Sequence, residues 1–285
     1  MYKDYALVLE GGGMRGTYTA GVLDYLMEKG IDFGSVYGVS AGALNGANFK
    51  AKQIGRGLRT FTNYLNDERY AGVHHLLKTG DWFNVDFSYN MIPNQLDPAD
   101  YDAFAASETK LYSVVSNVDS GKAEYLQLTD LRRKQDMDCL RASASLPILS
   151  NIVTVNGRKY LDGGVCDSIP LEKSIADGHR KNLVILTQHR GFVKKRSGNR
   201  YPSRVMYHKY PNFVKAMNER HNMYNRQLNH LYMQEKLGRA FIIQPKNKVE
   251  ISRLEKNAAK LIELYHMGKE DAKANYSALV EYLEE

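Results

Sequence analysis

Near the start of the chain stands Tyr5-Ala6-Leu7-Val8-Leu9-Glu10-Gly11-Gly12-Gly13-Met14-Arg15-Gly16, an apolar run that ends in a glycine-rich turn. An apolar run of this length, bounded by glycines, is typical of a strand buried on both faces. Residues 17–29 then carry apolar side chains near helical spacing, and Gly30 is suited to cap the end of that helix. The stretch therefore predicts a strand, a tight turn and a helix in immediate succession.

The same order repeats in the next segment. Residues 35–39 form a second short apolar run, which meets Ser40 and then a small-residue helix over 41–52. Strands that alternate with helices through tight glycine joints are typical of a parallel sheet covered by helices. We therefore predict an α/β protein, a three-layer α/β/α fold with a mainly parallel central sheet and a helical C-terminal extension.

The remaining segments are predicted from shorter signals. Strands are expected over 111–117, 124–128, 153–155, 158–161, 183–186 and 241–243, and helices over 140–145, 170–178 and 205–236. Pro93, Pro98 and several Asp and Asn residues predict a long loop over 84–102. The last part is expected to form a helical hairpin, with arms over 251–266 and 270–283 that are broken at Gly268.

The composition excludes several classes of protein. Hydrophobic residues make up 43% of the 285 residues and charged residues 25%, as in ordinary globular proteins. Two cysteines, Cys139 and Cys166, are too few for a disulfide scaffold or a four-cysteine zinc site. No apolar run approaches the roughly 18 residues that span a bilayer, and the N-terminus lacks the pattern of a secretory leader. We therefore expect a cytoplasmic protein.

Positive charge is concentrated in one segment. The net charge is +7, and residues 189–226, the basic block, hold ten Lys or Arg and one acidic residue. Such a block favours an anionic partner, although a solvated loop and helix face is the simpler interpretation. Several aromatic and methionine side chains lie within this block or shortly after it. The tyrosines could stack on bases or lie at a membrane interface, and the methionines could belong to the core. They are Tyr201, Tyr207, Tyr210, Tyr224, Met206, Met217 and Met233. Because no nucleic-acid fold motif accompanies the block, we expect no nucleic acid and favour peripheral contact with an anionic membrane surface.

The glycine-rich turn Gly11-Gly12-Gly13-Met14-Arg15-Gly16 is compatible with two chemistries. Glycines between a strand and a helix bind pyrophosphate in dinucleotide-binding proteins, and here Gly11, Gly13 and Gly16 with Asp32 would fill those roles. The same bare backbone N–H groups can also hold a developing oxyanion. Asp32 precedes the second apolar run instead of ending it, and the dinucleotide hypothesis leaves the next motif unexplained.

That next motif is Gly38-Val39-Ser40-Ala41-Gly42, which again joins a predicted strand to a predicted helix. The pattern Gly-x-Ser-x-Gly in this context is a nucleophile elbow, in which a sharp turn lifts the serine hydroxyl out of the sheet. The small neighbours let the chain pass without a clash. Ser40 is therefore the candidate nucleophile.

A third motif, Asp162-Gly163-Gly164, follows the predicted strand over 158–161. An aspartate at a strand end, with two glycines behind it, can project into a site. The alternative is an ordinary type I or type II turn, for which Asp and Gly are common residues.

Together these motifs resemble the patatin-like phospholipase family, in the family's own order. The intervening segment Arg141-Ala142-Ser143-Ala144-Ser145-Leu146-Pro147 is also similar to the Ala/Ser-rich helix that the family places between nucleophile and aspartate. The resemblance covers roughly residues 5–190. It implies a patatin-like catalytic domain over 1–190 and a basic, helical extension over 191–285 that packs on it.

The resemblance further implies a serine hydrolase that cleaves carboxylic esters of lipids through a Ser-Asp dyad. Ser40 would be the nucleophile and Asp162 its base, the N–H groups of Gly12 and Gly13 would form the oxyanion hole, and Arg15 would steady the loop. An acyl-enzyme would form without a metal or organic cofactor. The chain departs from many bacterial members at residues 17–19, where Thr-Tyr-Thr replaces their Ala-His, a position that is not catalytic in the family.

Two alternatives are kept beside it. A conventional Ser-Asp-His esterase would need a histidine after Asp162, and His179 or His189 has the right chain order. A non-enzymatic protein could instead bind lipid or nucleic acid through the basic block. We do not expect a metal site at His74-His75, because adjacent side chains do not point at one ion. We expect these histidines to lie in a loop or as a pair on the surface.

Overall fold

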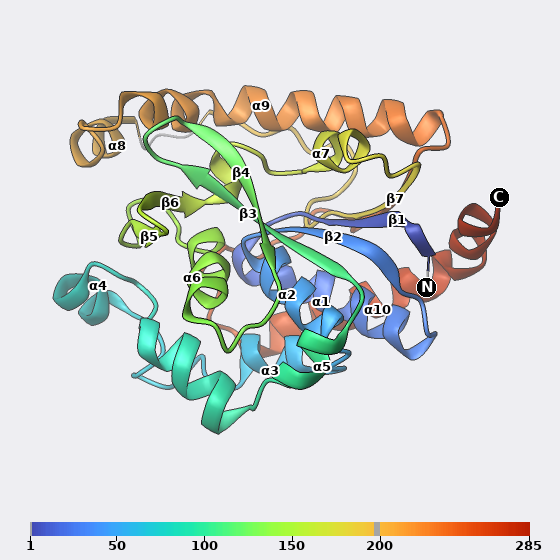
Figure 1. Cartoon of the computed structure of the whole chain (residues 1–285), viewed down its shortest axis with the longest axis horizontal. Coiled ribbons are helices and arrows are strands. Elements are labelled where there is room, and N and C mark those ends of the chain that lie inside the picture. Colours follow the sequence, from blue (N-terminus) through green and yellow to red (C-terminus); the bar gives the residue numbers. More distant parts are fainter. Residues whose placement is uncertain (1, 197–199) are drawn as a thin grey trace.

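The computed structural model describes residues 2–196 and 200–285, and its centre is one twisted sheet (Figure 1). Along the sheet the strand order is β5-β6-β3-β2-β1-β7-β8, and β4 also pairs with β3. The strands are β1 Tyr2–Leu9, β2 Phe33–Val39, β3 Lys110–Asn117, β4 Lys122–Leu128, β5 Val153–Val155, β6 Arg158–Asp162, β7 Lys181–Ile185 and β8 Ala240–Ile243. The run β3-β2-β1-β7-β8 is parallel, whereas β4 and β6 lie antiparallel to β3. The predicted mainly parallel sheet is confirmed.

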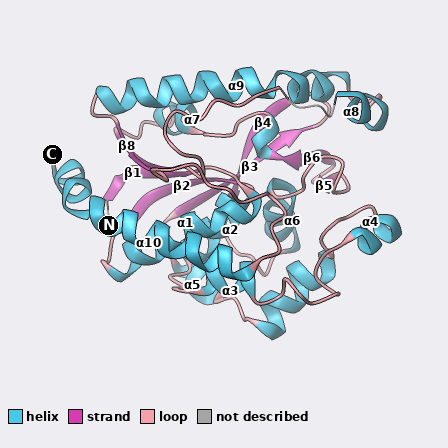
Figure 2. Cartoon of the chain, turned by 180° about the vertical axis from the view of Figure 1, so that it is seen from behind, coloured by secondary structure: helices cyan, strands magenta, loops and turns pink. Residues whose placement is uncertain are grey.

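Helices cover both faces of the sheet, which confirms the three-layer α/β/α prediction (Figure 2). One face carries α1 Gly16–Glu28, α2 Ala41–Lys50, α3 Arg56–Thr62 and α10 Ala258–Glu284. The other face carries α7 Leu171–Ala176 and α9 Pro211–Lys236. The remaining helices are α4 Val73–Thr79, a π-helix Phe87–Leu96, α5 Tyr101–Ala106, α6 Lys134–Ser143 and α8 Arg200–Met206, with 3-10 turns at Gly13–Arg15 and Gly163–Val165.

Cover on both faces explains why residues 6–9 of strand β1 are apolar at successive positions. Leu7 and Leu9 belong to the large core between the sheet and α1 and α10, whereas Val8 belongs to a second core beneath α9. All three side chains are fully buried. A strand covered on both faces must be apolar at successive positions, as the sequence predicts.

The predicted loop over 84–102 is wrong, because this segment forms the π-helix and leads into α5. Its polar residues act as caps: Asn84 Oδ1 accepts the Phe87 N–H at 3.2 Å, and Asp100 Oδ1 accepts the Ala103 N–H at 2.8 Å. Pro93 lies inside the π-helix. Asn and Asp therefore start helices here, which is their other common role beside turns.

The helical hairpin predicted at the end of the chain is also wrong, because α10 runs unbroken through Gly268. Gly268 lies where α10 crosses α1: a Cβ there would stand 2.1 Å from the Tyr18 carbonyl oxygen. On the facing helix, a Cβ at Gly21 would stand 2.0 Å from the Tyr265 carbonyl oxygen. The glycine is thus required for close helix packing and does not end the helix.

Two helix bounds also differ from prediction. The helix expected over 205–236 is divided into α8 and α9, and Pro211 takes the first position of α9, where a missing N–H costs nothing. Helix α6 begins at Lys134 instead of residue 140, because buried Asp136 accepts the N–H groups of Thr129 and Asp130 and holds the chain just before the helix.

Candidate active site

Ser40 lies at the joint between β2 and α2 in a strained backbone conformation. Its φ of 54° and ψ of −124° are rare for a residue with a side chain, and its side chain is buried at 6% exposure. The flanking glycines make this turn possible. A Cβ at Gly38 would stand 2.6 Å from Ala43 Cα, and one at Gly42 would stand 2.5 Å from the Leu9 carbonyl oxygen.

The backbone at Ser40 is fixed by a residue that the sequence analysis did not assign to the site. The Ser40 N–H donates to Ser143 Oγ at 2.9 Å, and the Ser143 hydroxyl donates to the Val114 carbonyl oxygen at 2.6 Å. Ser143 is fully buried near the end of α6. The Ala/Ser-rich segment 141–147 was the available signal, although the sequence alone does not say which serine faces the elbow.

Sheet register brings Asp162 to Ser40. Val39 of β2 pairs with Val114 of β3, and Asp162 of β6 pairs with the next residue, Val115. Strand β4 occupies the opposite edge of β3 along residues 111–117. Strands β2 and β6 therefore share one edge of β3 and meet end to end, so that the candidate nucleophile and the candidate base adjoin.

The two carboxylate oxygens of Asp162 differ in their surroundings. Oδ1 accepts the Gly164 N–H at 2.8 Å, whereas Oδ2 is buried and receives a hydrogen bond from no described residue. Burial raises the pKa of Asp162, and the nearby Ser40 hydroxyl, the Arg220 guanidinium and the Gly164 N–H offset only part of that rise. Asp162 is consequently more basic than an exposed aspartate, and one of its oxygens accepts no hydrogen bond from a described residue.

The two glycines after Asp162 leave room for the surrounding chain. A Cβ at Gly163 would stand 2.1 Å from the Val114 carbonyl oxygen, and one at Gly164 would stand 3.1 Å from Arg220 Nη2. The Gly164 carbonyl accepts the Arg220 Nε–H, which ties this turn to α9.

The glycine-rich turn lies beside Ser40 because of the register of β1 and β2. Leu9 pairs with Gly38, and Gly11 and Ser40 each follow two residues later in their strands' direction. A Cβ at Gly11 would stand 2.9 Å from Ser40 Cβ, so this glycine permits the close approach. Within the described part of the chain, the N–H groups of Gly12 and Gly13 have no acceptor. Gly13 has a φ of 57°, which suits glycine.

The rest of the turn serves packing and attachment. The Met14 N–H donates to the Arg253 carbonyl at 3.2 Å, and its side chain is buried beside Ala41. Arg15 Nη1 donates to the Ile251 carbonyl at 3.3 Å. A Cβ at Gly16 would stand 2.7 Å from Ala41 Cβ. In the predicted oxyanion-hole segment 11–16, the N–H groups of Met14, Arg15 and Gly16 therefore already have acceptors, whereas those of Gly11, Gly12 and Gly13 donate to no described residue.

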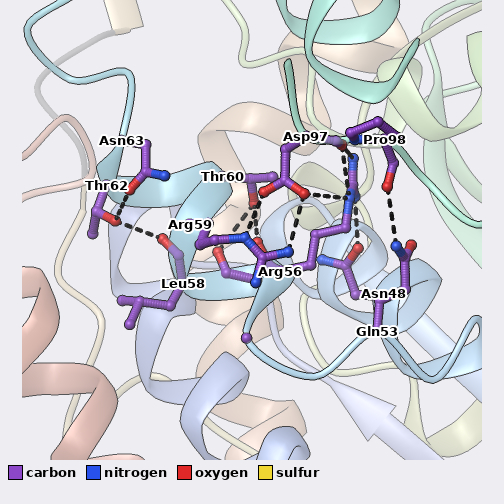
Figure 3. Close-up of polar contacts among 12 residues, drawn as sticks. Asn48, Gln53, Arg56, Leu58, Arg59, Thr60, Thr62, Asn63, Asp97 and Pro98 are labelled. Carbon is purple, nitrogen blue, oxygen red and sulfur yellow. Dashed lines mark hydrogen bonds and ion pairs between the residues drawn. The ribbon is translucent and has the colours of Figure 1, made fainter. Parts of the chain in front are cut away.

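An apolar cavity of about 160 Å³ extends from Ser40 between α2, α3 and the π-helix. Its wall includes Met14, Ala41, Leu44, Phe61 and Ile92. Asn48 and Arg56 of its wall belong to a polar network (Figure 3). There Arg59 makes two hydrogen bonds to the Asp97 carboxylate, at 2.8 and 3.0 Å, and Arg56 bonds the Asp97 carbonyl and Asn48 Oδ1.

Three cations that the sequence analysis did not assign enter the pocket of Ser40 and Asp162. They are Lys194 from the loop after β7, Arg220 from α9 and Arg253 from the loop before α10. Lys194 and Arg220 lie in the predicted basic block, which was the available signal. Arg253 lies outside it, and nothing in its local sequence indicates the site.

The structure separates the residues required by the alternative hypotheses from Ser40. His179 precedes β7 and so lies at the amino ends of the parallel strands, whereas Ser40 lies at their carboxyl ends. Its ring nitrogen Nδ1 contacts the Asp4 carbonyl oxygen. Asp32 also lies at the amino ends and pairs with Lys52 at 2.7 Å. His189 packs on Phe192 and does not line the Ser40 pocket. The Ser-Asp-His hypothesis therefore lacks its histidine near Ser40, and the dinucleotide hypothesis lacks its acidic residue near the glycine-rich turn.

Several tyrosine and methionine side chains in or near the basic block do not lie where the sequence suggested. Tyr207 and Tyr224 are buried and Tyr210 is half-buried, so this set does not form a stacking surface; Tyr201 lies outside the residues whose side chains are described. Met217 packs partly in the core, but Met206 and Met233 are about half exposed, which corrects their interpretation as core. Residues 197–199 of the block lie outside the described part of the chain.

His74 and His75 lie on α4 as a surface pair, as predicted, and not on a loop. Among the described residues, no group of three or more His, Cys, Asp or Glu side chains is arranged to hold a metal ion. None of the described helices is long and apolar enough to cross a membrane.

Comparison with protein families identifies two segments. Residues 7–175 match the model described as patatin-like phospholipase, and residues 210–284 match a domain of unknown function (DUF6363). The first match contains Ser40, Asp162 and both glycine motifs. The second contains Arg220 and Arg253.

Individual relatives agree with this assignment. The chain is 31% identical over 188 residues to the uncharacterized protein YjjU of Escherichia coli K12, covering 64% of this chain and 51% of YjjU. It is 24% identical to the probable lipid hydrolase 463L of Invertebrate iridescent virus 6, covering 62% and 65%. It is 25% identical to the lysophospholipase NTE1 of Cryptococcus neoformans, covering 64% of this chain and 11% of NTE1. The chain thus spans half to two thirds of the first two relatives and a small part of the third.

Among solved structures, VipD from Legionella pneumophila superimposes with a TM-score of 0.45 and 13% identity, covering 99% of this chain and 67% of VipD.

Proposed function

The chain belongs to the patatin-like phospholipase family, and we propose that it cleaves carboxylic esters of lipids through Ser40 and Asp162. One observation carries the proposal. The strained Ser40 lies at the end of β2, and the free, buried Oδ2 of Asp162 lies at the end of β6, which meets it along one edge of β3. A serine activated by an adjacent base is the usual arrangement of nucleophilic catalysis.

In the first half-reaction, Ser40 Oγ attacks the ester carbonyl carbon and Asp162 accepts the hydroxyl proton. The carbonyl oxygen becomes an oxyanion, for which the free N–H groups of Gly12 and Gly13 are the available donors. The bond to the alcohol oxygen then breaks, and Asp162 returns the proton to that leaving group. The acyl group remains on Ser40 as an ester.

In the second half-reaction, Asp162 takes a proton from water, and the resulting hydroxide attacks the acyl-enzyme. The bond to Ser40 Oγ breaks, and the proton passes from Asp162 to that oxygen, so that serine is regenerated. The raised pKa of Asp162 supports both roles, because an aspartate at its usual pKa near 3.8 is a weak base at neutral pH. This chemistry requires neither a metal nor an organic cofactor.

The apolar cavity beside Ser40 supports a lipid substrate. An acyl chain whose carbonyl lies at Ser40 would extend along Met14, Leu44 and Ile92 and away from solvent. We keep two further hypotheses from the sequence: division into a catalytic domain over 1–190 and an extension over 191–285, and peripheral contact of the basic block with anionic lipid in the cytoplasm.

Active-site labelling with a fluorophosphonate, followed by intact mass and peptide mapping, tests the proposal. We expect stoichiometric labelling at Ser40, none in Ser40→Ala and slow labelling in Asp162→Asn. Ser88→Ala is the matched control, because Ser88 lines the same apolar cavity and no described residue bonds its buried hydroxyl. Labelling of Ser88, or no labelling of the folded wild-type protein with and without vesicles, would contradict the proposal.

A further inference from the structure

A second hollow, of about 400 Å³, adjoins the pocket of Ser40 and Asp162. The two share Lys194, Arg220 and Arg253, and Arg253 also lines the apolar cavity. The side chains of Phe192 and Met217 complete part of its wall. Arg253 therefore stands where the three hollows meet.

Positive charge exceeds negative charge at these three cations, because they and Arg15 share the Ser40 pocket with only two carboxylates, Glu10 and Asp162. Within the described part of the chain, none of them forms an ion pair with a carboxylate. Glu10 accepts hydrogen bonds from Thr187 and from the Tyr224 hydroxyl, at 2.7 to 3.1 Å, and its charge only partly offsets the lowered pKa values of Lys194 and Arg220. A hollow lined by unpaired cations favours an anionic occupant.

The backbone at Lys194 and Arg253 and the side chain of Arg220 are fixed by hydrogen bonds. The backbone of Lys194 makes two hydrogen bonds to the Asn225 side chain, at 2.9 and 3.0 Å, and its Nζ lies 4.1 Å from the centre of the Tyr224 ring. Arg220 donates Nε–H to the Gly164 carbonyl, and the Arg253 carbonyl accepts the Met14 N–H. An anion would therefore meet cations carried on fixed backbone segments, which lowers the entropic cost of binding.

Their proximity has a measurable consequence. Burial, followed by the charges of Arg220 and Arg253, lowers the pKa of Lys194 to about 7. Burial and the charge of Arg253 lower the pKa of Arg220 to about 10. An anion bound among these groups would relieve the repulsion and raise both values.

We propose that Lys194, Arg220 and Arg253 bind the phosphate group of a phosphorylated lipid ester while its carbonyl lies at Ser40. The inference rests on the proposed function, which places the reacting ester between the two hollows. An acyl arm then occupies the apolar cavity and a phosphate arm the cationic one. Phosphate suits the site because it offers several oxygens to lysine and arginine donors at once, whereas a carboxylate product would stay at Ser40.

The first arm of the test measures binding without turnover. Calorimetric titration of the Ser40→Ala protein uses sn-glycerol 3-phosphate, inorganic phosphate and glycerol as probes. We expect glycerol 3-phosphate to bind, glycerol not to bind, and Lys194→Gln in the same background to weaken glycerol 3-phosphate at least tenfold. The control Lys215→Gln removes the same charge from an exposed position on α9 and should change affinity less than twofold.

The second arm measures selectivity. Hydrolysis of a lysophosphatidic acid is compared with that of the monoacylglycerol carrying the same acyl chain, in neutral detergent micelles. We expect Lys194→Gln and Arg253→Gln to raise KM for the phosphorylated ester about tenfold or more, and to lower the ratio of kcat/KM for the phosphorylated ester to kcat/KM for the uncharged ester by a similar factor. The exposed control Lys215→Gln should leave both esters unchanged. Circular dichroism and thermal unfolding show that each variant is folded.

The outcomes separate this inference from the proposed function. Hydrolysis of both esters with equal KM, together with no binding of glycerol 3-phosphate, overturns the phosphate site and leaves the hydrolase. If glycerol 3-phosphate binding depends on Lys194 but the wild-type protein cleaves neither ester, the phosphate site is supported and the hydrolase is contradicted. Binding of inorganic phosphate alone, with no difference in KM between the esters, shows a free-phosphate site and overturns the headgroup assignment.

Discussion

Two of the regions where residues 191–285 meet the rest of the protein are built in opposite ways. Where α10 crosses α1, glycines allow backbone contact, and the polar side chains are paired: Tyr265 with Asp24, Tyr18 with Asp271, and Lys269 with Glu28. Around Lys194, Arg220 and Arg253, by contrast, cations line open space without ion pairs among the described residues.

The difference separates stability from function. A paired and closely packed interface stabilises the fold, whereas buried charges without partners destabilise it and are kept only where a ligand needs them. Substitutions in the first region should therefore lower the free energy of unfolding. Substitutions in the second should change activity or selectivity and leave the fold as stable as before, or more so.

The largest expected effect is in the catalytic pocket. Ser40→Ala and Asp162→Asn should each lower kcat/KM for a lipid ester by about 10⁴-fold or more, because each removes a group needed for acyl transfer. Asp162→Asn should also raise the melting temperature. The folded state raises the pKa of Asp162, so its ionisation above that pKa costs stability at neutral pH, and asparagine avoids that cost.

Kinetic assays and thermal unfolding at pH 7 check both halves of this prediction. Ser143→Ala provides a comparison. It removes the acceptor of the Ser40 N–H and the donor to the Val114 carbonyl but no reacting group, so it should weaken activity far less than Ser40→Ala. A fall in stability for Asp162→Asn would show that the aspartate supports the fold and would blur the distinction between the two regions.

The next largest effect is expected at the helix crossing. Gly268→Val would place carbon atoms against the Tyr18 carbonyl, where even a Cβ would lie at 2.1 Å, so α10 must move away from α1. We expect the free energy of unfolding to fall by about 3 kcal/mol or more, by analogy with overpacked cores. Urea unfolding measures it. Ala274→Val, on the exposed side of the same helix, should cost about 0.5 kcal/mol.

This crossing also shows where sequence reasoning reaches its limit. The two strand–turn–helix joints and the aspartate motif are local patterns, so the α/β/α fold and the candidates Ser40, Asp162, Gly12 and Gly13 could be predicted from spacing and family resemblance. Gly268 was misread as a helix break because its role depends on Tyr18, 250 residues away in sequence. A glycine that breaks a helix and one that lets helices touch look alike in a single sequence.

The cations of the second hollow were missed for a similar reason. Lys194, Arg220 and Arg253 come from a loop, a helix and another loop, and only the folded chain brings them together. The basic block indicated an anionic partner, but most of its charges are exposed. Composition therefore suggested the ligand's charge and could not indicate which three residues face the site.

A smaller effect should follow loss of one hydrogen bond in the paired region. Tyr265→Phe removes the hydroxyl that donates to Asp24 Oδ2 at 2.7 Å and leaves this carboxylate only the Gly55 N–H at 2.9 Å. Burial already raises the pKa of Asp24, and the Tyr265 hydroxyl opposes that rise. We expect a loss of about 2 kcal/mol at pH 7, typical of a hydrogen bond to a buried charge. The double variant with Asp24→Asn should lose less than the sum of the single variants, as a thermodynamic cycle can measure.

The smallest effect should have the opposite sign, at Lys194. Folding lowers the pKa of this side chain from its usual 10.5 to about 7, so the unfolded chain binds more protons between those values. The cost of burying the charge is fully present below pH 7 and disappears as the pH rises toward 10.5. Lys194→Met should therefore raise the free energy of unfolding by about 1 kcal/mol at pH 6, and by progressively less between pH 7 and 10.

Urea unfolding at pH 6 and pH 9.5 measures the change, and Lys215→Met, at an exposed position, should show no such pH dependence. Destabilisation by Lys194→Met at pH 6 would mean that the lysine has a partner in the protein, and the two regions would then differ in packing alone.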